Sequence, residues 1–206
     1  MEKEKILDSI IIKYEAALKV LETQIEIINN DFKYIKKYNP IEHVKTRMKS
    51  YDSIIKKMEM DDIPFSAENV EQYINDVVGV RIICSFNSDI YDLIDILRNS
   101  SLIKIVHEKD YITNPKKSGY RSYHLIVEVP VELINGKYNV RAEIQIRTLA
   151  MDLWASLNHK LVYKADYSSA YIDGKLKMIG DELNSIDNEM TELFDLQTKI
   201  REKTEL

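Results

Sequence analysis

The stretch that most constrains the fold of this chain is residues 141–148, Arg-Ala-Glu-Ile-Gln-Ile-Arg-Thr, where polar and apolar residues alternate. A period of two predicts a half-buried β-strand, and a helical run, Leu149–Tyr163, follows it directly. The polar face of this strand carries Arg141, Glu143, Gln145 and Arg147, and the apolar face carries Ala142, Ile144 and Ile146. Such a polar face suits a charged ligand, because arginines neutralise phosphates while a carboxylate holds a metal ion or takes a proton. A solvated face with cross-strand ion pairs is the alternative.

Length and composition indicate one domain over residues 1–206. With 45% hydrophobic and 31% charged residues, the chain is long enough for a sizeable core. Its one cysteine, Cys84, lies in an apolar run, which excludes an internal disulfide framework and favours the reducing cytoplasm. We expect neither export nor a membrane partner, because no long uninterrupted apolar segment is present. The net charge of -5 argues against coating nucleic acid through bulk charge, so any phosphate site must be a local basic pocket.

Hydrophobic periodicity predicts an α+β chain, with a mixed sheet of about five strands surrounded by helices. A long amphipathic helix is expected over residues 4–38, a second helix over Ile41–Met60, which is rich in Lys and Arg, and a short one from Ser66 to Tyr73. The predicted strands are Val77–Phe86, 102–107, Leu125–Val129 and Tyr138–Arg147, with a helix over Ile90–Asn99 and a turn at Asn135-Gly136.

The C-terminal segment, residues 173–203, repeats apolar side chains at alternating spacings of three and four. This heptad-like stripe predicts a long helix that packs either on its own domain or against another subunit. Together with the first helix it offers more apolar surface than a small sheet can cover. We therefore expect self-association.

The segment from Tyr111 to His124 combines aromatic rings with positive charge. Pro115 and Gly119 keep it irregular, and its three cations are Lys116, Lys117 and Arg121. A nucleotide base could stack on Tyr120 while the cations meet its phosphates. A basic surface loop without a ligand is the alternative.

Two carboxylates in separate strands are candidates for one metal site. Asp76 stands at the head of strand 77–86, and Glu143 lies in strand 138–147. If these strands are neighbours, both could hold one Mg²⁺ surrounded by Arg47, Lys49, Lys57, Arg81 and Arg121. This equipment is typical of phosphoryl transfer, in which the protein positions groups and neutralises charge. The absence of GxxxxGK[ST], GxGxxG and HExxH argues against P-loop, Rossmann and zinc-hydrolase chemistry.

Four segments in order resemble the motifs of the RelA/SpoT-type (p)ppGpp synthetase domain: RMKSYDSIIKK (47–57), DVVGVR (76–81), SGYRSYH (118–124) and EIQIRT (143–148). The segment MDLWASLNHKLVYK (151–164) is similar to the single-domain members, the small alarmone synthetases of the RelQ/RelP kind. The resemblance covers about residues 40–165. It implies a nucleotidyltransferase-like catalytic core of that extent, with long helices on both flanks.

The resemblance also implies an activity, the transfer of the β,γ-pyrophosphate of ATP to the 3′-hydroxyl of GDP or GTP with release of AMP. By position, Asp76 would hold Mg²⁺, and Glu143 would hold or orient the ion and help activate the 3′-hydroxyl. The ATP site would comprise Arg47, Lys49, Ser53, Lys57 and Arg81, with the two arginines on either side of the adenine. The acceptor site would comprise Lys116, Tyr120, Arg121, His124 and Gln145, with the tyrosine stacked on guanine.

Family members of the small type form homotetramers, some with a site for an allosteric alarmone or single-stranded RNA, so the resemblance implies these partners as well. One departure is Asn158, where related small synthetases often carry Glu, and it could shift the acceptor preference. Two other functions remain open. One is pyrophosphorylation of the 3′ end of tRNA, as in toxin-like relatives, and the other is nucleotide or RNA binding by an oligomer without catalysis.

Overall fold

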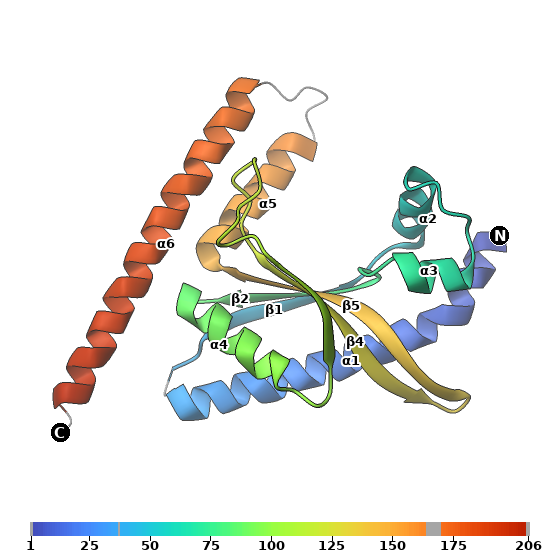
Figure 1. The fold of residues 1–206 in the computed structure, drawn as a ribbon, viewed down its shortest axis with the longest axis horizontal. Coiled ribbons are helices and arrows are strands. Elements are labelled where there is room, and N and C mark those ends of the chain that lie inside the picture. The colour runs from blue at the N-terminus through green and yellow to red at the C-terminus, as the bar shows by residue number, and fades with distance from the viewer. Residues whose placement is uncertain (1, 37, 164–169, 205–206) are drawn as a thin grey trace.

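Five strands form one mixed β-sheet in the order β1-β2-β5-β4-β3 (Figure 1). They are β1 (Ile41–Met48), β2 (Val78–Cys84), β3 (Lys104–Asp110), β4 (Tyr123–Leu133) and β5 (Gly136–Thr148). β2 and β5 run parallel, and the other neighbouring pairs are antiparallel. The computed structural model describes residues 2–36, 38–163 and 170–204. The predicted mixed sheet of about five strands is confirmed, while residues 164–165, the end of the predicted catalytic core, lie outside the described residues.

Six helices surround the sheet in the described part of the chain. They are α1 (Glu2–Lys36), α2 (Tyr51–Met60), α3 (Ala67–Tyr73), α4 (Asn87–Arg98), α5 (Leu149–Tyr163) and α6 (Ala170–Thr204). Both long terminal helices that the sequence predicts are present. Over the described ranges, no helix is at once long and apolar enough to cross a membrane.

The prediction of one helix over Ile41–Met60 was wrong in its first half, which forms the edge strand β1. Its backbone pairs with β2 along almost the whole strand, and the pairing continues where the Lys49 amide donates to the Val77 carbonyl. Ser50 then ends the strand by capping α2, since its hydroxyl accepts a hydrogen bond from the Ser53 amide. The strand forms because the exposed edge of the buried β2 offers backbone partners, which outweigh a local helical tendency.

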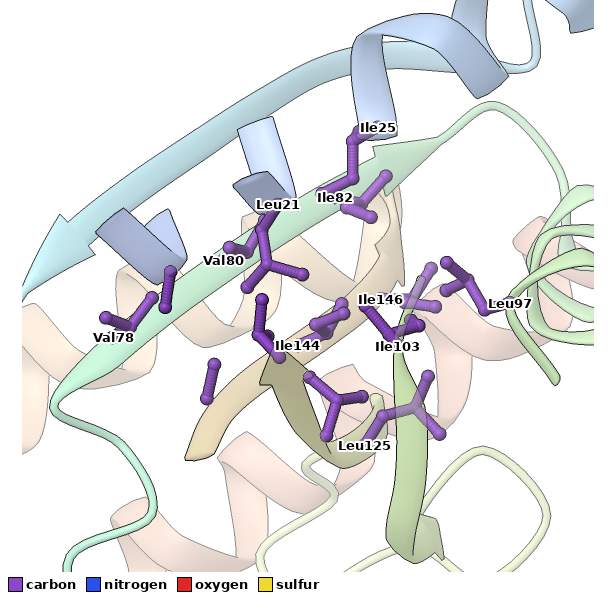
Figure 2. Close-up of a cluster of buried hydrophobic side chains, with 14 of the residues drawn as sticks. Leu21, Ile25, Val78, Val80, Ile82, Leu97, Ile103, Leu125, Ile144 and Ile146 are labelled. Carbon is purple, nitrogen blue, oxygen red and sulfur yellow. The ribbon is translucent and has the colours of Figure 1, made fainter. Parts of the chain in front are cut away.

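The hydrophobic core lies on one face of the sheet, beneath α1 and α4. Figure 2 shows side chains from both helices meeting those of the central strands, and its labelled members are Leu21, Ile25, Val78, Val80, Ile82, Leu97, Ile103, Leu125, Ile144 and Ile146. All ten are nearly or fully buried. A fully buried aliphatic side chain contributes about 1.5–3 kcal/mol, so this face dominates the stability of the fold.

Because side chains alternate along a strand, the opposite face of β2 and β5 carries the residues that lie between the core positions. The residues between the core positions are Gly79, Arg81, Glu143 and Gln145, none of them a large apolar side chain. The helices α2 and α5 begin directly after β1 and β5, at two ends of this second face (Figure 1). The polar face of β5 is therefore a cavity floor rather than a core surface.

Candidate active site

Cross-strand register aligns residues of four strands in two rows, and most of these residues carry polar side chains. The first row is Arg47, Gly79, Glu143 and Ile126, and the second is Lys45, Arg81, Gln145 and His124. Residues opposite each other in a ladder point to the same side, so both rows share one face. The parallel pairing of β2 with β5 is what places Arg81 beside Gln145, as the two-carboxylate hypothesis requires of these strands.

A cavity of about 270 Å³ opens over these rows, lined by Lys45, Thr46, Arg47, Gly79, Val80, Arg81, Glu143 and Gln145. Gly79 forms part of its floor, and a Cβ atom there would lie only 3.3 Å from the Arg47 Nε. The glycine thus lets the guanidinium cross the strand closely. Two guanidinium groups on one wall and a carboxylate on the floor suit a ligand with a flat ring and phosphates.

Asp76 lies just before β2 and is held by two lysines from different elements. Its Oδ2 accepts a hydrogen bond of 2.6 Å from Lys49 Nζ, and its Oδ1 accepts one of 3.0 Å from Lys57 Nζ on α2. Burial alone would raise the pKa of Asp76, but the two lysines lower it below its usual value. The group is therefore a carboxylate at neutral pH.

Glu143 is also held by two side chains, His124 and Gln145. Its Oε1 lies 3.1 Å from His124 Nδ1, and its Oε2 accepts a hydrogen bond of 2.9 Å from Gln145 Nε2. Burial raises the pKa of Glu143, but the hydrogen bond and charge of His124 and the hydrogen bond from Gln145 together outweigh burial, so the net shift is downward. The charge of Asp76 acts to raise this pKa, which means that the two carboxylates lie within electrostatic reach of each other.

These two carboxylates fit a magnesium ion that arrives with phosphates. Within the described residues, no three His, Cys, Asp or Glu side chains gather into a ready metal cage. Mg²⁺ in proteins is commonly held by one or two carboxylates together with substrate phosphates and water. Asp76 and Glu143 are the side chains that could supply the protein's share.

A continuous hydrogen-bonded chain joins Glu143 to the aromatic loop. His124 Nε2 lies 2.8 Å from the Tyr120 hydroxyl, which in turn accepts a hydrogen bond of 2.8 Å from Arg147 Nη2. Because a carboxylate only accepts, we assign the hydrogen on His124 to Nδ1, so that Nε2 accepts from the tyrosine. The acceptor tyrosine of the sequence hypothesis is half-buried, and its hydroxyl is fixed at this end.

Arg147 and Asp152 are the residues that sequence reasoning missed. Arg147 is buried, and besides Tyr120 it donates to Gln145 Oε1 and to Asp152 Oδ1, each at 2.9 Å. Asp152 on α5 also accepts a hydrogen bond of 3.3 Å from Arg81 in β2. The alternation of β5 put Arg147 on the polar face, but its partners come from a loop and a helix that the pattern could not place.

In the loop 111–122, one lysine lies over the rings of two tyrosines. Lys116 Nζ lies 4.8 Å from the ring centre of Tyr111 and 5.0 Å from that of Tyr120. The Lys116 amide and the Tyr120 carbonyl form a hydrogen bond that closes the loop tip. The tip therefore presents one ammonium group beside Tyr120, as the sequence hypothesis expects of a phosphate-binding loop.

Two of the predicted site residues make other contacts in this structure. Ser53 lies on the first turn of α2, where its hydroxyl is 2.8 Å from that of Ser50. The Arg121 guanidinium binds α6, through the Gly180 carbonyl at 3.2 Å and Asp181 Oδ1 at 3.1 Å. Ser53 is exposed, and Arg121 is not among the residues that line the cavity.

The family model described as "Region found in RelA / SpoT proteins" matches residues 46–168. The chain belongs to the RelA/SpoT family. The match contains Asp76, Glu143 and the whole hydrogen-bonded chain of the site, while α6 lies beyond it.

Individual relatives agree with this assignment. The chain is 49% identical over 151 residues to the GTP pyrophosphokinase YwaC of Bacillus subtilis (strain 168), covering 73% of this chain and 72% of YwaC. Among solved structures, it resembles the small alarmone synthetase 1 of Bacillus subtilis bound to its product pppGpp, with a TM-score of 0.83, 33% identity and coverage of 91% and 96%. The same relative bound to AMPCPP gives a TM-score of 0.78 and 28% identity, covering 95% of this chain and 99% of the relative.

Proposed function

We propose that this chain is a GTP pyrophosphokinase that moves the β,γ-pyrophosphate of ATP to the 3′-hydroxyl of GDP or GTP and releases AMP. The observation that carries the proposal is the 49% identity to the GTP pyrophosphokinase YwaC over 73% of this chain. The cavity of the RelA/SpoT-type core supports it, because cations and the Glu143 carboxylate line the same space and Asp76 lies within electrostatic reach of Glu143. The products are (p)ppGpp.

The donor ATP binds on the β1–β2 side of the cavity. Arg47 and Arg81 line that wall and bind the adenine between them, and Lys49, Ser53 and Lys57 bind the phosphates. In this structure both lysines neutralise Asp76. Phosphates compete for these ammonium groups, so ATP binding releases the oxygens of Asp76 for a metal ion.

Mg²⁺ is the cofactor that these residues fit, with Asp76 and Glu143 as its protein ligands. When bound, the ion neutralises charge on the transferring phosphates. The acceptor 3′-oxygen attacks the β-phosphorus, the bond from that phosphorus to the oxygen bridging it to the α-phosphorus breaks, and AMP leaves with the bridging oxygen. The proton of the 3′-hydroxyl passes to the Glu143 carboxylate, which His124 and Gln145 hold in place.

The acceptor guanosine nucleotide stacks on Tyr120, with Lys116, His124 and Gln145 around it. The contacts of the Tyr120 hydroxyl support this assignment, because hydrogen bonds to Arg147 and His124 fix the position of the ring. A fixed ring loses little freedom on stacking, which favours binding.

The test is an assay of the purified chain with Mg²⁺, labelled ATP and either GDP or GTP. We expect equal amounts of AMP and of a 3′-pyrophosphorylated guanosine nucleotide, and no product from Asp76→Asn. Labelled ATP offered with tRNA separates the alternative acceptor. Transfer to tRNA alone, or no AMP with any acceptor, would contradict the proposal.

Self-association, as a homotetramer of the kind that the resemblance implies, is part of this proposal. Four leucines recur every fourth residue on α5 and are each about half exposed: Leu149 51%, Leu153 50%, Leu157 47% and Leu161 57%. α6 carries its own exposed apolar side chains, Ile186, Met190, Leu193, Leu196 and Ile200, all more than 50% exposed. Exposed apolar side chains that recur at helical spacing along two helices favour a protein interface.

A further inference from the structure

The aromatic loop 111–122 is built against α6, a helix outside the region that the family model matches. Gly119 is the point of contact, and its φ of +91° is one that side chains rarely adopt. A Cβ atom on Gly119 would lie 3.1 Å from the Lys177 Cα and 3.3 Å from the Lys177 carbonyl oxygen. The loop backbone therefore touches the helix backbone with no room for a side chain between them.

A second glycine makes the contact reciprocal. Gly180 lies inside α6, and a Cβ atom there would lie 3.0 Å from the Gly119 carbonyl oxygen and 3.0 Å from the Trp154 Nε1. A glycine inside a helix destabilises the helix by about 0.5–1 kcal/mol relative to alanine, so its presence needs a packing reason. The close approach of the loop supplies that reason. The other glycine of the helix, Gly174, has open space around it.

Arg121 stabilises the contact between the loop and α6 through hydrogen bonds and an ion pair. Its guanidinium donates to the Gly119 and Gly180 carbonyls, at 3.4 and 3.2 Å, and pairs with Asp181 at 3.1 Å. The side chain is only 12% exposed, so these hydrogen bonds are well shielded from water. The arginine next to the acceptor tyrosine thus joins the loop to α6.

α6 is itself anchored on both sides of this contact. Toward its start, Trp154 Nε1 donates a hydrogen bond of 2.9 Å to the Leu176 carbonyl. Toward its end, the Thr148 hydroxyl donates to Asp187 at 2.6 Å, and the Phe194 ring stacks on Phe86 at 4.2 Å between centroids. The helix is a fixed support for the loop rather than a free arm.

We propose that α6 positions the acceptor site, with Gly180 and Arg121 as positioning residues that set the place of Tyr120. The inference rests on the proposed function, since it takes the loop around Tyr120 as the guanosine-binding loop. Tyr120 directly precedes Arg121 and contacts Trp154 edge-on, with ring centroids 6.3 Å apart. Moving the loop off α6 displaces this ring while leaving the β1–β2 wall of the ATP site in place.

The test compares Gly180→Ala and Gly180→Val with the unaltered chain in steady-state kinetics. We expect the valine variant to raise the KM for the acceptor by at least about fivefold, because extra side-chain atoms in a tight contact carry a penalty of that size. The alanine variant should fall between, and the KM for ATP should stay within about twofold, since the donor wall does not touch α6. Gly174→Ala is the matched control on the same helix and should change neither KM.

Binding without turnover gives a second measurement. Trp154 is the only tryptophan of the chain, so its fluorescence reports on the α6 contact and on the neighbouring tyrosine. Titration with GDP should give weaker binding in the valine variant, and titration with AMPCPP should give unchanged binding. If Gly180→Val does not fold, Asp181→Ala, which removes a surface partner of Arg121, must show the same selective rise in acceptor KM.

The possible results of these experiments separate the positioning role from the proposed function. A folded variant with unchanged acceptor KM and GDP binding, or with both KM values raised equally, overturns the positioning role. Failure of the unaltered chain to make product from ATP and GDP or GTP contradicts the proposed function instead. The two failures are therefore distinguishable.

Discussion

The carboxylate of Glu143 offers the sharpest test of the mechanism, through the substitution Glu143→Gln. The side chain keeps its size and place, but only one oxygen remains to accept hydrogen bonds, whereas His124 Nδ1 and Gln145 Nε2 both donate to it now. A buried donor without an acceptor costs about 1–3 kcal/mol. The larger effect is chemical, because an amide cannot take the proton of the 3′-hydroxyl.

The size of the effect follows from what the carboxylate does. Loss of a positioned proton acceptor lowers turnover by about 10²–10⁴-fold, or about 2.7–5.5 kcal/mol in activation free energy. The proposed ATP site lies on the wall formed by β1 and β2, so binding of AMPCPP should change by less than about threefold. We expect this separation of turnover from donor binding.

The assay measures AMP release by anion-exchange chromatography and AMPCPP binding by titration calorimetry. Glu128→Gln is the matched control. Glu128 lies on β4, on the same face of the sheet as Glu143. It pairs with Lys104 at 3.7 Å and does not line the cavity. The control should keep the activity of the unaltered chain. Turnover of Glu143→Gln at the level of that control would refute a chemical role for this carboxylate.

Three further predictions address the acceptor, the pH dependence and assembly. Tyr120→Ala should raise the acceptor KM about tenfold, since base stacking contributes about 1–3 kcal/mol, and Tyr120→Phe should raise it less; equal values would mean that guanine stacks elsewhere. Burial raises the pKa of Asp187, against its hydrogen bond from Thr148, so the native state binds a proton more readily than the unfolded chain and stability falls as pH rises through the window above the ordinary value of 3.8; Asp187→Asn should remove that slope in thermal unfolding. Leu153→Glu with Leu157→Glu should yield a folded, smaller species in light scattering, and an unchanged mass would place the interface elsewhere.

The sheet and most of the candidate site could be predicted because their signals are local. The alternation in β5 placed Glu143 and Gln145 on a polar face, and the structure has them there. The two-residue turn of the β4–β5 hairpin falls at Ile134–Asn135, one position before the predicted turn, and Gly136 already pairs in the ladder. Side-chain period specifies which face a residue occupies more firmly than where a strand ends.

What the sequence could not predict concerns residues whose partners are distant in the chain. β1 was taken as a helix because its strand state depends on the edge of β2, and the ion pair of Arg121 with Asp181 joins residues 60 positions apart. No window of sequence contains both members of such pairs.

The sequence by itself determined the polar and apolar faces of the strands, the long terminal helices and the family motifs, since each depends on residues close together in the chain. Tertiary structure decided which groups meet: that Lys49 and Lys57 neutralise Asp76, that Arg147 anchors Tyr120, and that α6 packs against the loop 111–122. The physical reason is that hydrogen bonds and ion pairs depend on distances of a few ångströms, which only the packing of remote elements establishes.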